Sequence, residues 1–406
     1  MAASGAPAAT ADTLATRAMV ARVVGIPTVK GQGKVPEMAH YLAGEFWRAG
    51  WADGDVEVIA YNTGSPDGTA NDQTAALIVR WRVTGGASQR PIMVMGHMDV
   101  VAAKREDFTK DPSKLAEGDG YFYGRGTVYI KGGVVVVVRA MIELRAGGFR
   151  PERDIVVFFT GDKESHGLGA EKGAGEWLPK LGNPEYALNA DGIGVRVADD
   201  GTPIGATMPT GEKGYADYIL TVRNPGGHSG TARPDNAIYS LARALGRIDA
   251  HRFAPVMKAG HASNMLPEFA TALVNCRLFP QASPDAVRDE LEAAVACAEF
   301  AVARNDNYPA TIMPPLRTDV TAAFTKAVRA VHPGMPVAPT IVTGATDART
   351  FRRIGIPVYA VSAQWLRVPS DMRVDHADER IPVQLLYNGV RHWKIMLGEL
   401  VGGPIE

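Results

Sequence analysis

Two kinds of hydrophobic pattern alternate along the first half of the chain. Apolar residues recur at helical spacing over residues 13–24, 35–50 and 131–145. Short runs rich in β-branched and aromatic residues predict strands over residues 75–83, 91–98, 154–159 and 186–189. Alternating helices and strands favour an α/β sandwich with a largely parallel central sheet, in which the active site is expected at the strand ends.

A second pattern begins near Gly211. Here the sequence predicts, in order, a strand, a helix, a strand and a helix over residues 215–222, 236–248, 271–278 and 284–303. After Pro315 the α/β pattern resumes, with a helix over 320–331 and strands near Pro339 and Val358. We therefore expect an inserted α+β domain at 210–314, within an α/β domain formed by 13–209 and 315–406.

Composition and charge restrict the partners. The chain is 46% hydrophobic and 21% charged, which is typical of a soluble globular protein. Its 43 Lys and Arg against 44 Asp and Glu give no net field that would attract nucleic acid or an anionic membrane. The longest apolar run, around Val134 to Val138, is far short of the roughly 20 residues that span a bilayer. We expect neither nucleic acid nor membrane as a partner.

The cysteines and the N-terminal residues say little about location. Cys276 and Cys297 are the two cysteines, so neither a disulfide framework nor a cysteine zinc site is expected, and both a cytoplasmic and an exported protein stay open. Residues 1–12 are mostly small and include Pro7, which predicts a disordered tail and not an intact signal peptide. Any metal ion would have to use histidine and carboxylate ligands.

Candidate ligands follow several of the predicted strands. Gly96-His97-Met98-Asp99 ends an apolar strand, where His97 suits a metal and Asp99 suits an orienting carboxylate, although the tetrapeptide also suits a simple strand cap. Further carboxylates follow in TGDKES, in LNADG and in the cluster 375–380. A solvated acidic loop is the alternative for each one. Several such clusters at one sheet edge favour a site.

The order of motifs along the chain resembles a known family. It contains GHMDVV, DGYFYGRGT with IKGG, FFTGDKES, NADG, NPGGHSG, GHASNMLP, NCRLFP, TGATDARTFRRIGIP and DERI. This series is similar to the zinc peptidase family of aminoacylase, acetylornithine deacetylase and carboxypeptidase G, from about Val24 to Leu397. The resemblance implies a mainly parallel-sheet α/β sandwich as catalytic domain, with an inserted α+β (ferredoxin-like) lid and dimerisation domain. It also implies a homodimer.

The resemblance assigns roles to single residues. The family holds two zinc ions that share a bridging Asp, and a Glu beside a metal ligand is the general base. By position, His97 and Asp191 match ligands of one zinc, and Glu164 matches a ligand of the other. Asp99 matches the carboxylate that orients the histidine. These four residues are those that the family pattern requires.

The resemblance also implies a binding site for the substrate. His228 matches a lid histidine that stabilises the oxyanion, commonly across a dimer interface. Asn264 and Arg277 match lid positions that hold the carboxylate of the substrate. The expected substrate is therefore a small molecule with a carboxylate, such as an N-acyl amino acid or a small peptide.

Three positions depart from the family pattern. Tyr129 stands where the bridging Asp is expected, and Lys163 stands where the general base is expected. A neutral phenol is a poor bridge, and a charged ammonium cannot take up a proton. The last ligand should be a His four residues before Glu379, where the chain has Asp375, while His376 is one residue out of register. We expect one zinc ion or none in place of two.

These departures leave three functions open for an amidohydrolase-like protein with an altered metal site. It is an amide hydrolase of N-acyl amino acids or small peptides, or a metal-free lyase or isomerase that uses Lys163 and Tyr129, or a binding protein without chemistry. Lys163 also suits a purely structural role, in which it pairs with Glu164, Asp191 or Asp375 and supplies part of the missing positive charge.

Overall fold

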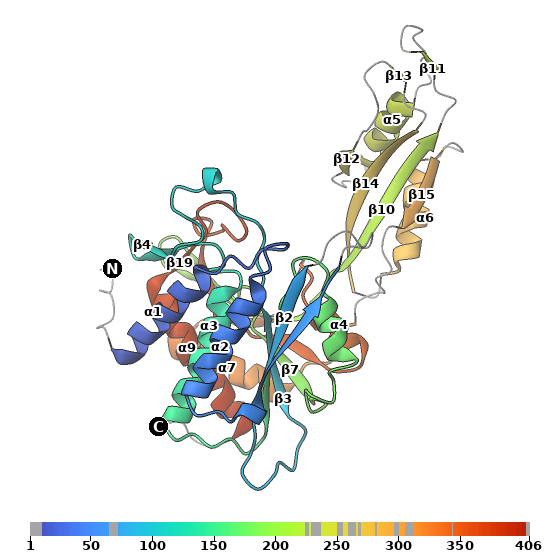
Figure 1. Ribbon diagram of the computed structural model, residues 1–406. Helices are drawn as coiled ribbons and strands as arrows, with labels where there is room; N and C mark the ends of the chain where they lie inside the picture. The colour runs from blue at the N-terminus through green and yellow to red at the C-terminus, as the bar shows by residue number, and fades with distance from the viewer. Residues whose placement is uncertain are drawn as a thin grey trace. The chain divides into compact units, whose positions relative to one another are not determined.

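The computed structural model describes residues 10–64, 72–223, 227–228, 237–249, 255–258, 265–266, 269–280, 282–295, 300–304, 312–342 and 344–402. The chain divides into two compact units (Figure 1). The first consists of Met1–Thr210, Pro314–Thr340 and Thr346–Glu406, and the second of Gly211–Met313 and Ile341–Ala345. Each unit has a hydrophobic core of its own.

A six-stranded sheet forms the centre of the first unit. Its order is β1 (Val56–Asn62), β2 (Gln73–Trp81), β6 (Ile155–Thr160), β3 (Ile92–His97), β7 (Tyr186–Asn189) and β17 (Val358–Ala360). The last four strands of this order run parallel, and β1 and β2 add an antiparallel hairpin at one edge. The predicted α/β fold with a mainly parallel sheet is confirmed.

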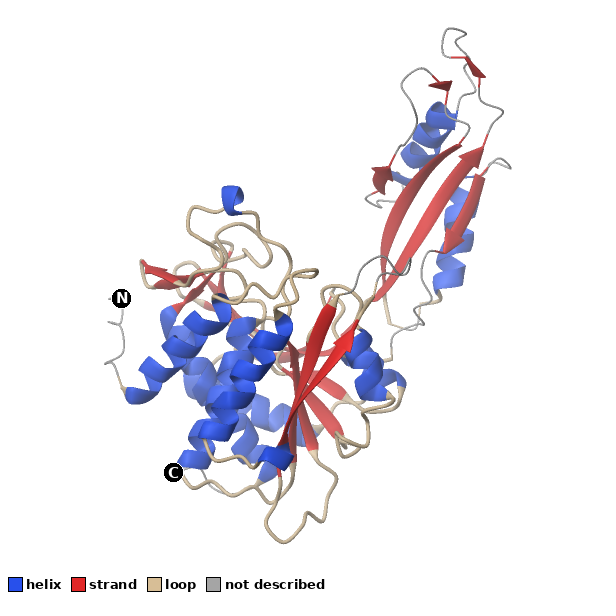
Figure 2. Ribbon diagram, in the orientation of Figure 1, coloured by secondary structure: helices blue, strands red, loops and turns tan. Residues whose placement is uncertain are grey.

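Helices cover both faces of this sheet (Figure 2). One face carries α1 (Ala11–Val24), α2 (Val35–Arg48), α3 (Lys131–Ala146), α7 (Thr318–Val331) and α9 (Val383–Val401), and the other carries α4 (Leu168–Ala174) and α8 (Ala348–Arg353). Alternate residues of β3 enter the two cores: Ile92 and Val94 face the larger helix layer, Met93 and Met95 the smaller one. Because successive side chains of a strand point to opposite faces of the sheet, β3 packs against the helix layers on both sides.

Tertiary burial decides the structure of α3. Its run from Val134 to Val138 consists of β-branched residues, which favour strands in isolation. All five valines are buried in the core beneath the sheet, and the surrounding helices α1 and α9 pack against α3. Burial of this apolar face outweighs the weak local preference.

Two smaller sheets and two short 3-10 helices lie mainly in the first unit. They are β16 (Val337–Val342), β9 (Pro203–Glu212), β8 (Val195–Ala198) and β18 (Trp365–Val368) in one sheet, β19 (Arg380–Pro382), β5 (Tyr121–Tyr123) and β4 (Ala116–Gly118) in the other, and η1 (Asp53–Asp55) and η2 (Arg105–Asp107). The ends of β9 and β16, residues 211–212 and 341–342, belong to the second unit. The pairing of β19 with β5 brings the segment before β19 beside the loop that leads into α3.

The second unit is an antiparallel sheet with two helices. Its order is β12 (Pro255–Lys258), β14 (Phe269–Leu278), β10 (Gly214–Arg223) and β15 (Phe300–Arg304), with α5 (Ala237–Asp249), α6 (Pro284–Val295) and the two-stranded pair β11 (Gly227–His228) and β13 (Met265–Leu266). Along the chain the main elements follow the order strand, helix, strand, strand, helix, strand. This is the ferredoxin-like arrangement that the family resemblance implied, with two strands more than the sequence pattern predicted.

Some predicted boundaries are wrong. The tail was expected to reach residue 12, but α1 begins at Ala11, because Thr10 caps it and accepts a hydrogen bond from the Thr13 N–H (3.2 Å). Residues 1–9 lie outside the described part. The helix expected over 284–303 ends at Val295, and β15 follows, because pairing with β10 buries Val302 in the core.

The sequence patterns did not predict the C-terminal helix α9. It packs on α3 and α7 and buries His392, Trp393 and Met396. Within the described ranges, no helix is long and apolar enough to cross a membrane.

A buried carboxylate fixes the loop before α3. Glu379 is fully buried. Its Oε1 accepts the backbone N–H groups of Val128 (2.8 Å) and Tyr129 (3.0 Å). Its Oε2 accepts the N–H of Gly126 (3.0 Å) and a hydrogen bond from Arg125 Nη1 (2.9 Å). One side chain from the C-terminal half therefore sets the backbone that carries Tyr129.

Replacing Glu379 by Gln should lower the free energy of unfolding by about 3 kcal/mol, because the buried Arg125 then loses its counter-charge. Urea unfolding at pH 7 measures this change. Glu117→Gln is the matched control: its pair with Arg17 is about half exposed, so the loss should be about 1 kcal/mol or less. Equal losses in the two variants would contradict this role of Glu379.

His392 is a buried, neutral histidine. Its side chain packs against Phe324 with ring centroids 5.5 Å apart, and its Nε2–H donates to the Val361 carbonyl (3.2 Å). Burial lowers the pKa of His392 from 6.5 to about 4. Since the folded state disfavours the imidazolium, the stability gained from the neutral form is present above pH 6.5 and is lost as the pH falls toward 4.

The unfolding free energy should therefore fall by up to about 3 kcal/mol more between pH 7 and 4 in the natural chain than in His392→Gln, which does not titrate. Chemical unfolding at several pH values tests this slope. The exposed His40 supplies the control His40→Gln, whose pH dependence should match that of the natural chain. An unchanged slope in His392→Gln would show that His392 is not the responsible group.

Candidate functional site

Polar residues meet at the carboxyl ends of the parallel strands. His97 ends β3, the pair Lys163 and Glu164 follows β6, and Asp191 follows β7. Tyr129 comes from the loop before α3. Residues that are far apart in the sequence thus gather at one sheet edge, the usual position of binding sites in open α/β sheets.

Asp99 connects two of these strand ends. The Nδ1–H of His97 donates to the Asp99 carbonyl (3.0 Å) and lies 3.2 Å from Asp99 Oδ1. The same carboxylate accepts the backbone N–H groups of Lys163 (3.2 Å) and Glu164 (2.7 Å). Asp99 therefore orients the His97 ring, so that its Nε2 faces the cluster, and also holds the loop after β6.

The Lys163 ammonium lies between the side chains of Tyr129 and Glu164. Its Nζ donates to Tyr129 Oη (2.7 Å) and to Glu164 Oε1 (2.9 Å). The side chains of Lys163 and Glu164 are 12% and 17% exposed. The Tyr129 ring also packs edge-on against His97, with centroids 5.6 Å apart. An ammonium and a phenol therefore stand at the centre of the cluster.

Asp191 is the least satisfied member of the cluster. It is 2% exposed, and its Oδ2 lies 3.7 Å from His97 Nε2, which in turn lies 3.8 Å from Glu164 Oε1. Both oxygens of Asp191 and the Nε2 of His97 have no hydrogen-bond partner among the residues that the structure describes. The site thus keeps buried polar atoms that face one another.

The carboxylates determine the charges of the neighbouring groups. Burial alone would lower the pKa of Lys163, but Asp191, Tyr129 and Glu164 outweigh it and raise this pKa above its usual range. Burial and the charge of Asp191 raise the pKa of Tyr129 well above 10. Burial lowers the pKa of His97, but the hydrogen bond with Asp99 and the charge of Asp191 raise it to about 9. At neutral pH Lys163 is therefore an ammonium, His97 an imidazolium and Tyr129 a neutral phenol.

This donor set does not fit a pair of metal ions. Over the described ranges of the chain, no group of three or more His, Cys, Asp or Glu side chains is placed to hold a metal ion. The Lys163 ammonium has no lone pair for a metal at neutral pH, and it already donates a hydrogen bond to the Glu164 carboxylate. Tyr129, a neutral phenol, cannot bridge two cations as a carboxylate does.

Asp375 and His376 lie at the border of the cluster. Asp375 Oδ1 is 3.7 Å from Arg125 Nη1, and burial and the charge of Glu164 raise its pKa. His376 is exposed, and its backbone N–H donates to Arg373 O (3.1 Å). Asp375 is thus close enough to the cluster to feel its charges, whereas no contact joins His376 to the cluster in the described structure.

The lid residues belong to the second unit. His228 lies in β11, which pairs with β13, and Arg277 lies in β14 opposite Tyr215. The side chains of His228 and Arg277, and the whole of Asn264, lie outside the described residues. Their roles remain predictions.

Sequence reasoning missed two buried carboxylates that support the site. Glu379 fixes the Tyr129 loop, as described above. Asp347 accepts a hydrogen bond from Thr160 Oγ1 (2.5 Å), and Thr160 pairs with His97 across β6 and β3. Burial raises the pKa of Asp347 to about 7. The segment TGATDAR was the available signal, but it pointed to the family and not to this contact.

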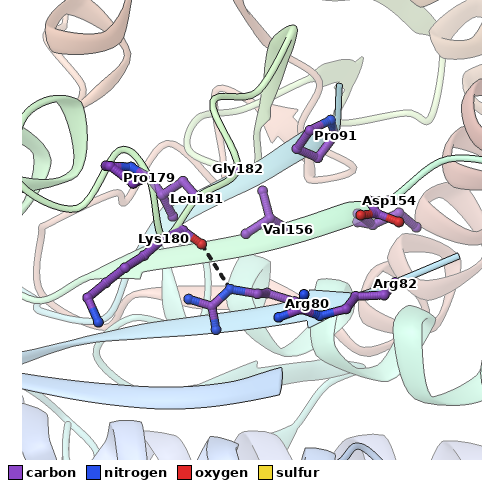
Figure 3. Close-up of a pocket in the computed structure, with 10 residues that line it drawn as sticks. Arg80, Arg82, Pro91, Asp154, Val156, Pro179, Lys180, Leu181 and Gly182 are labelled. Atoms are coloured by element: carbon purple, nitrogen blue, oxygen red, sulfur yellow. Dashed lines mark hydrogen bonds between the residues drawn. The ribbon is translucent and has the colours of Figure 1, made fainter. Parts of the chain in front are cut away.

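A cavity of about 300 Å³ lies at the opposite edge of the sheet (Figure 3). It is lined by the starts of β3 and β6, the end of β2 and the segment from Pro179 to Gly182. The Arg80 Nε–H donates to the Lys180 carbonyl (2.8 Å), and both cations also pair with Glu57. Arg82 pairs with Asp55. The three described cations that line the cavity are therefore all paired and are not free for an anionic ligand.

Known proteins share this fold over nearly the whole chain. A di-peptidase of Saccharomyces cerevisiae, Dug1p, superposes with a TM-score of 0.74 at 16% identity and covers 97% of both chains. A dinuclear metal-binding peptidase of Bacillus subtilis has a TM-score of 0.63 at 11% identity and covers 96% of this chain and 99% of its own. At these identities the likeness shows the fold.

Sequence comparison gives the family. An N-fatty-acyl-amino acid synthase/hydrolase of Xenopus tropicalis is 26% identical over an alignment of 360 residues, which covers 72% of this chain and 69% of the relative. The model of peptidase family M20/M25/M40 matches residues 93–399, most of the chain. Members of this family are metal-dependent. The chain belongs to peptidase family M20/M25/M40.

Proposed function

We propose that this protein binds N-acyl amino acids or small peptides at the strand-end site and does not hydrolyse them by the two-metal route of its family. One observation carries the proposal: the Lys163 ammonium donates to Tyr129 (2.7 Å) and Glu164 (2.9 Å) at the centre of the site. The position expected for the general base thus holds a proton donor, and the position expected for the metal bridge holds a phenol.

Hydrolysis of an amide needs an activated water. A general base accepts the proton of that water, and such a group contributes typically 10²–10⁴-fold to the rate. Lys163 has no lone pair while it is protonated, and the neighbouring carboxylates keep it protonated. Asp99 already accepts the N–H groups of Lys163 and Glu164, and Glu164 pairs with the Lys163 ammonium. Water activation is therefore the step that this chain lacks.

Ligand binding has separate support. The relative from Xenopus tropicalis is named for N-fatty-acyl-amino acids, and the fold neighbour from Saccharomyces cerevisiae is a di-peptidase. By resemblance, Asn264 and Arg277 hold the carboxylate of such a ligand, and His228 acts on its carbonyl oxygen across the interface of a homodimer. These lid positions keep the residues that the family pattern requires. The proposed ligand is thus a small acyl compound with a free carboxylate.

A metal-free lyase or isomerase is the second candidate. The 2.7 Å hydrogen bond between Lys163 and Tyr129 favours it, since an amine and a phenol in contact can exchange a proton. The raised pKa of Lys163 weakens it, because attack on a carbonyl requires the neutral amine. Turnover that survives chelation and is lost in Lys163→Gln would identify this second function.

Restoring the acidic residues should restore hydrolysis. The double variant Tyr129→Asp with Lys163→Glu should gain hydrolysis of N-acyl amino acids or dipeptides by about 10²-fold or more in the presence of added zinc. The control Tyr129→Asn with Lys163→Gln removes the same side chains without adding carboxylates and should stay inactive. Release of the free amino acid measures both. Comparable zinc-dependent turnover in the unchanged protein would refute the proposal.

The carboxylate of the ligand should be held by Arg277. Arg277→Ala should weaken binding of an N-acyl amino acid about 10- to 100-fold, because a charge-assisted hydrogen bond contributes about 1.5–3 kcal/mol. Binding of the matching carboxamide should change little. Calorimetry of both ligands measures the difference, with Arg288→Ala on α6 as the control. Equal losses for acid and carboxamide would rule out a role in carboxylate recognition.

A further inference from the structure

We infer that the Lys163 ammonium takes the place of a bound metal cation, so that the chain itself neutralises the carboxylates of the site. The positive charge that metal ions supply in the family then comes from the Lys163 side chain. Removing this charge should allow the site to bind a metal ion. The inference rests on the same altered residues as the proposed function. Its consequences concern metal binding and stability, and they hold whether or not a ligand binds.

The positions of the charges support this exchange. Asp99, Glu164 and Asp191 place three carboxylates around His97, within 3.8 Å of its ring nitrogens. Lys163 contacts Glu164 directly, with 2.9 Å between Nζ and Oε1. Asp99 and Asp191 are at most 4% exposed, so water screens them little. Carboxylates buried at such separations need a cation among them.

Tyr129 completes the replacement. A bridging carboxylate would add a further negative charge to the cluster, whereas the phenol adds none and still accepts the second hydrogen bond of Lys163 (2.7 Å). The ammonium also lies 4.8 Å from the centre of the Tyr129 ring, within reach of a cation–π interaction. The two departures from the family pattern are therefore coupled: one removes an anion and the other supplies a cation.

The side chains that a metal would use are still present, and metal binding would displace the Nε2 proton of His97. His97 Nε2 and both oxygens of Asp191 have no hydrogen-bond partner in the part of the chain that is described, and Glu164 is occupied by Lys163. The donor separations of 3.7 and 3.8 Å are close to the roughly 3.4 Å that separates two ligands of a tetrahedral zinc ion. In the described ranges no group of three such side chains is placed to hold a metal while Lys163 is present. We expect that loss of the ammonium lets His97, Asp191 and Glu164 approach one another as an ordinary set of one His and two carboxylates.

Cobalt(II) binding tests the inference without any substrate. Lys163→Met and Lys163→Gln remove the charge, and Lys163→Arg keeps it. Lys172→Met is the matched control, because Lys172 forms a partly exposed surface pair with Glu176. Each protein is purified without added metal, treated with chelator, dialysed and titrated with Co²⁺. Visible absorption, bound cobalt and the melting temperature are recorded.

The natural chain, Lys163→Arg and Lys172→Met should bind little cobalt and melt at the same temperature with Co²⁺ or chelator. At least one neutral Lys163 variant should bind about one Co²⁺ per chain and melt at a higher temperature with the metal. A neutral variant that folds only with Co²⁺ gives the same support.

Tight, stoichiometric cobalt binding by the natural chain would overturn the inference. So would the absence of any gain in both neutral variants, and a variant that stays unfolded with Co²⁺ counts as no gain. The proposed function is judged separately, by ligand binding and turnover. Weak cobalt binding together with no binding of N-acyl amino acids or small peptides would refute the proposed function and leave this inference standing.

Discussion

The contact of the Lys163 ammonium with Tyr129 and Glu164 is the interaction on which the site depends. Three strand ends deliver carboxylates to one edge of the sheet, a geometry suited to cations. Carboxylates so close together and so little exposed cannot remain charged without a counter-ion. In this chain the counter-ion is part of the polypeptide. The fold can therefore keep the architecture of a metallopeptidase while its site is neutralised from within.

The supporting structure is arranged to hold this centre in place. Asp99 fixes the His97 ring and the backbone of Lys163 and Glu164, while Glu379 fixes the loop that carries Tyr129. Each uses a buried carboxylate to organise backbone N–H groups. The positions of the side chains in the site thus follow from the strand ends and from these two anchors. A change of chemistry at Tyr129 and Lys163 needs no change of scaffold.

Much of this could be predicted from the sequence, for physical reasons. The strands of the central sheet and α3 are long apolar segments, and the motifs GHMD, GDKES and NADG sit where strands end. The contacts of Glu379 and Asp347 could not be predicted, because each joins segments about 250 or 187 residues apart through the hydrogen bonds of one side chain. The predicted helix 284–303 included residues 300–303 of β15, because the pairing of this strand with β10 is a tertiary contact that the local sequence does not show. The spacing of Asp375 and His376 from Glu379 left the register open, and only the structure shows which of them lies near Arg125.

Metal content tests the central claim most directly. The protein is purified without added metal, and zinc and manganese are determined by elemental analysis before and after zinc loading and dialysis. We predict a value near zero in both samples, since Lys163 already supplies the positive charge of the site. A value near two ions per chain would contradict the account, because it would mean that Tyr129 and Lys163 leave the metal centre of the family intact.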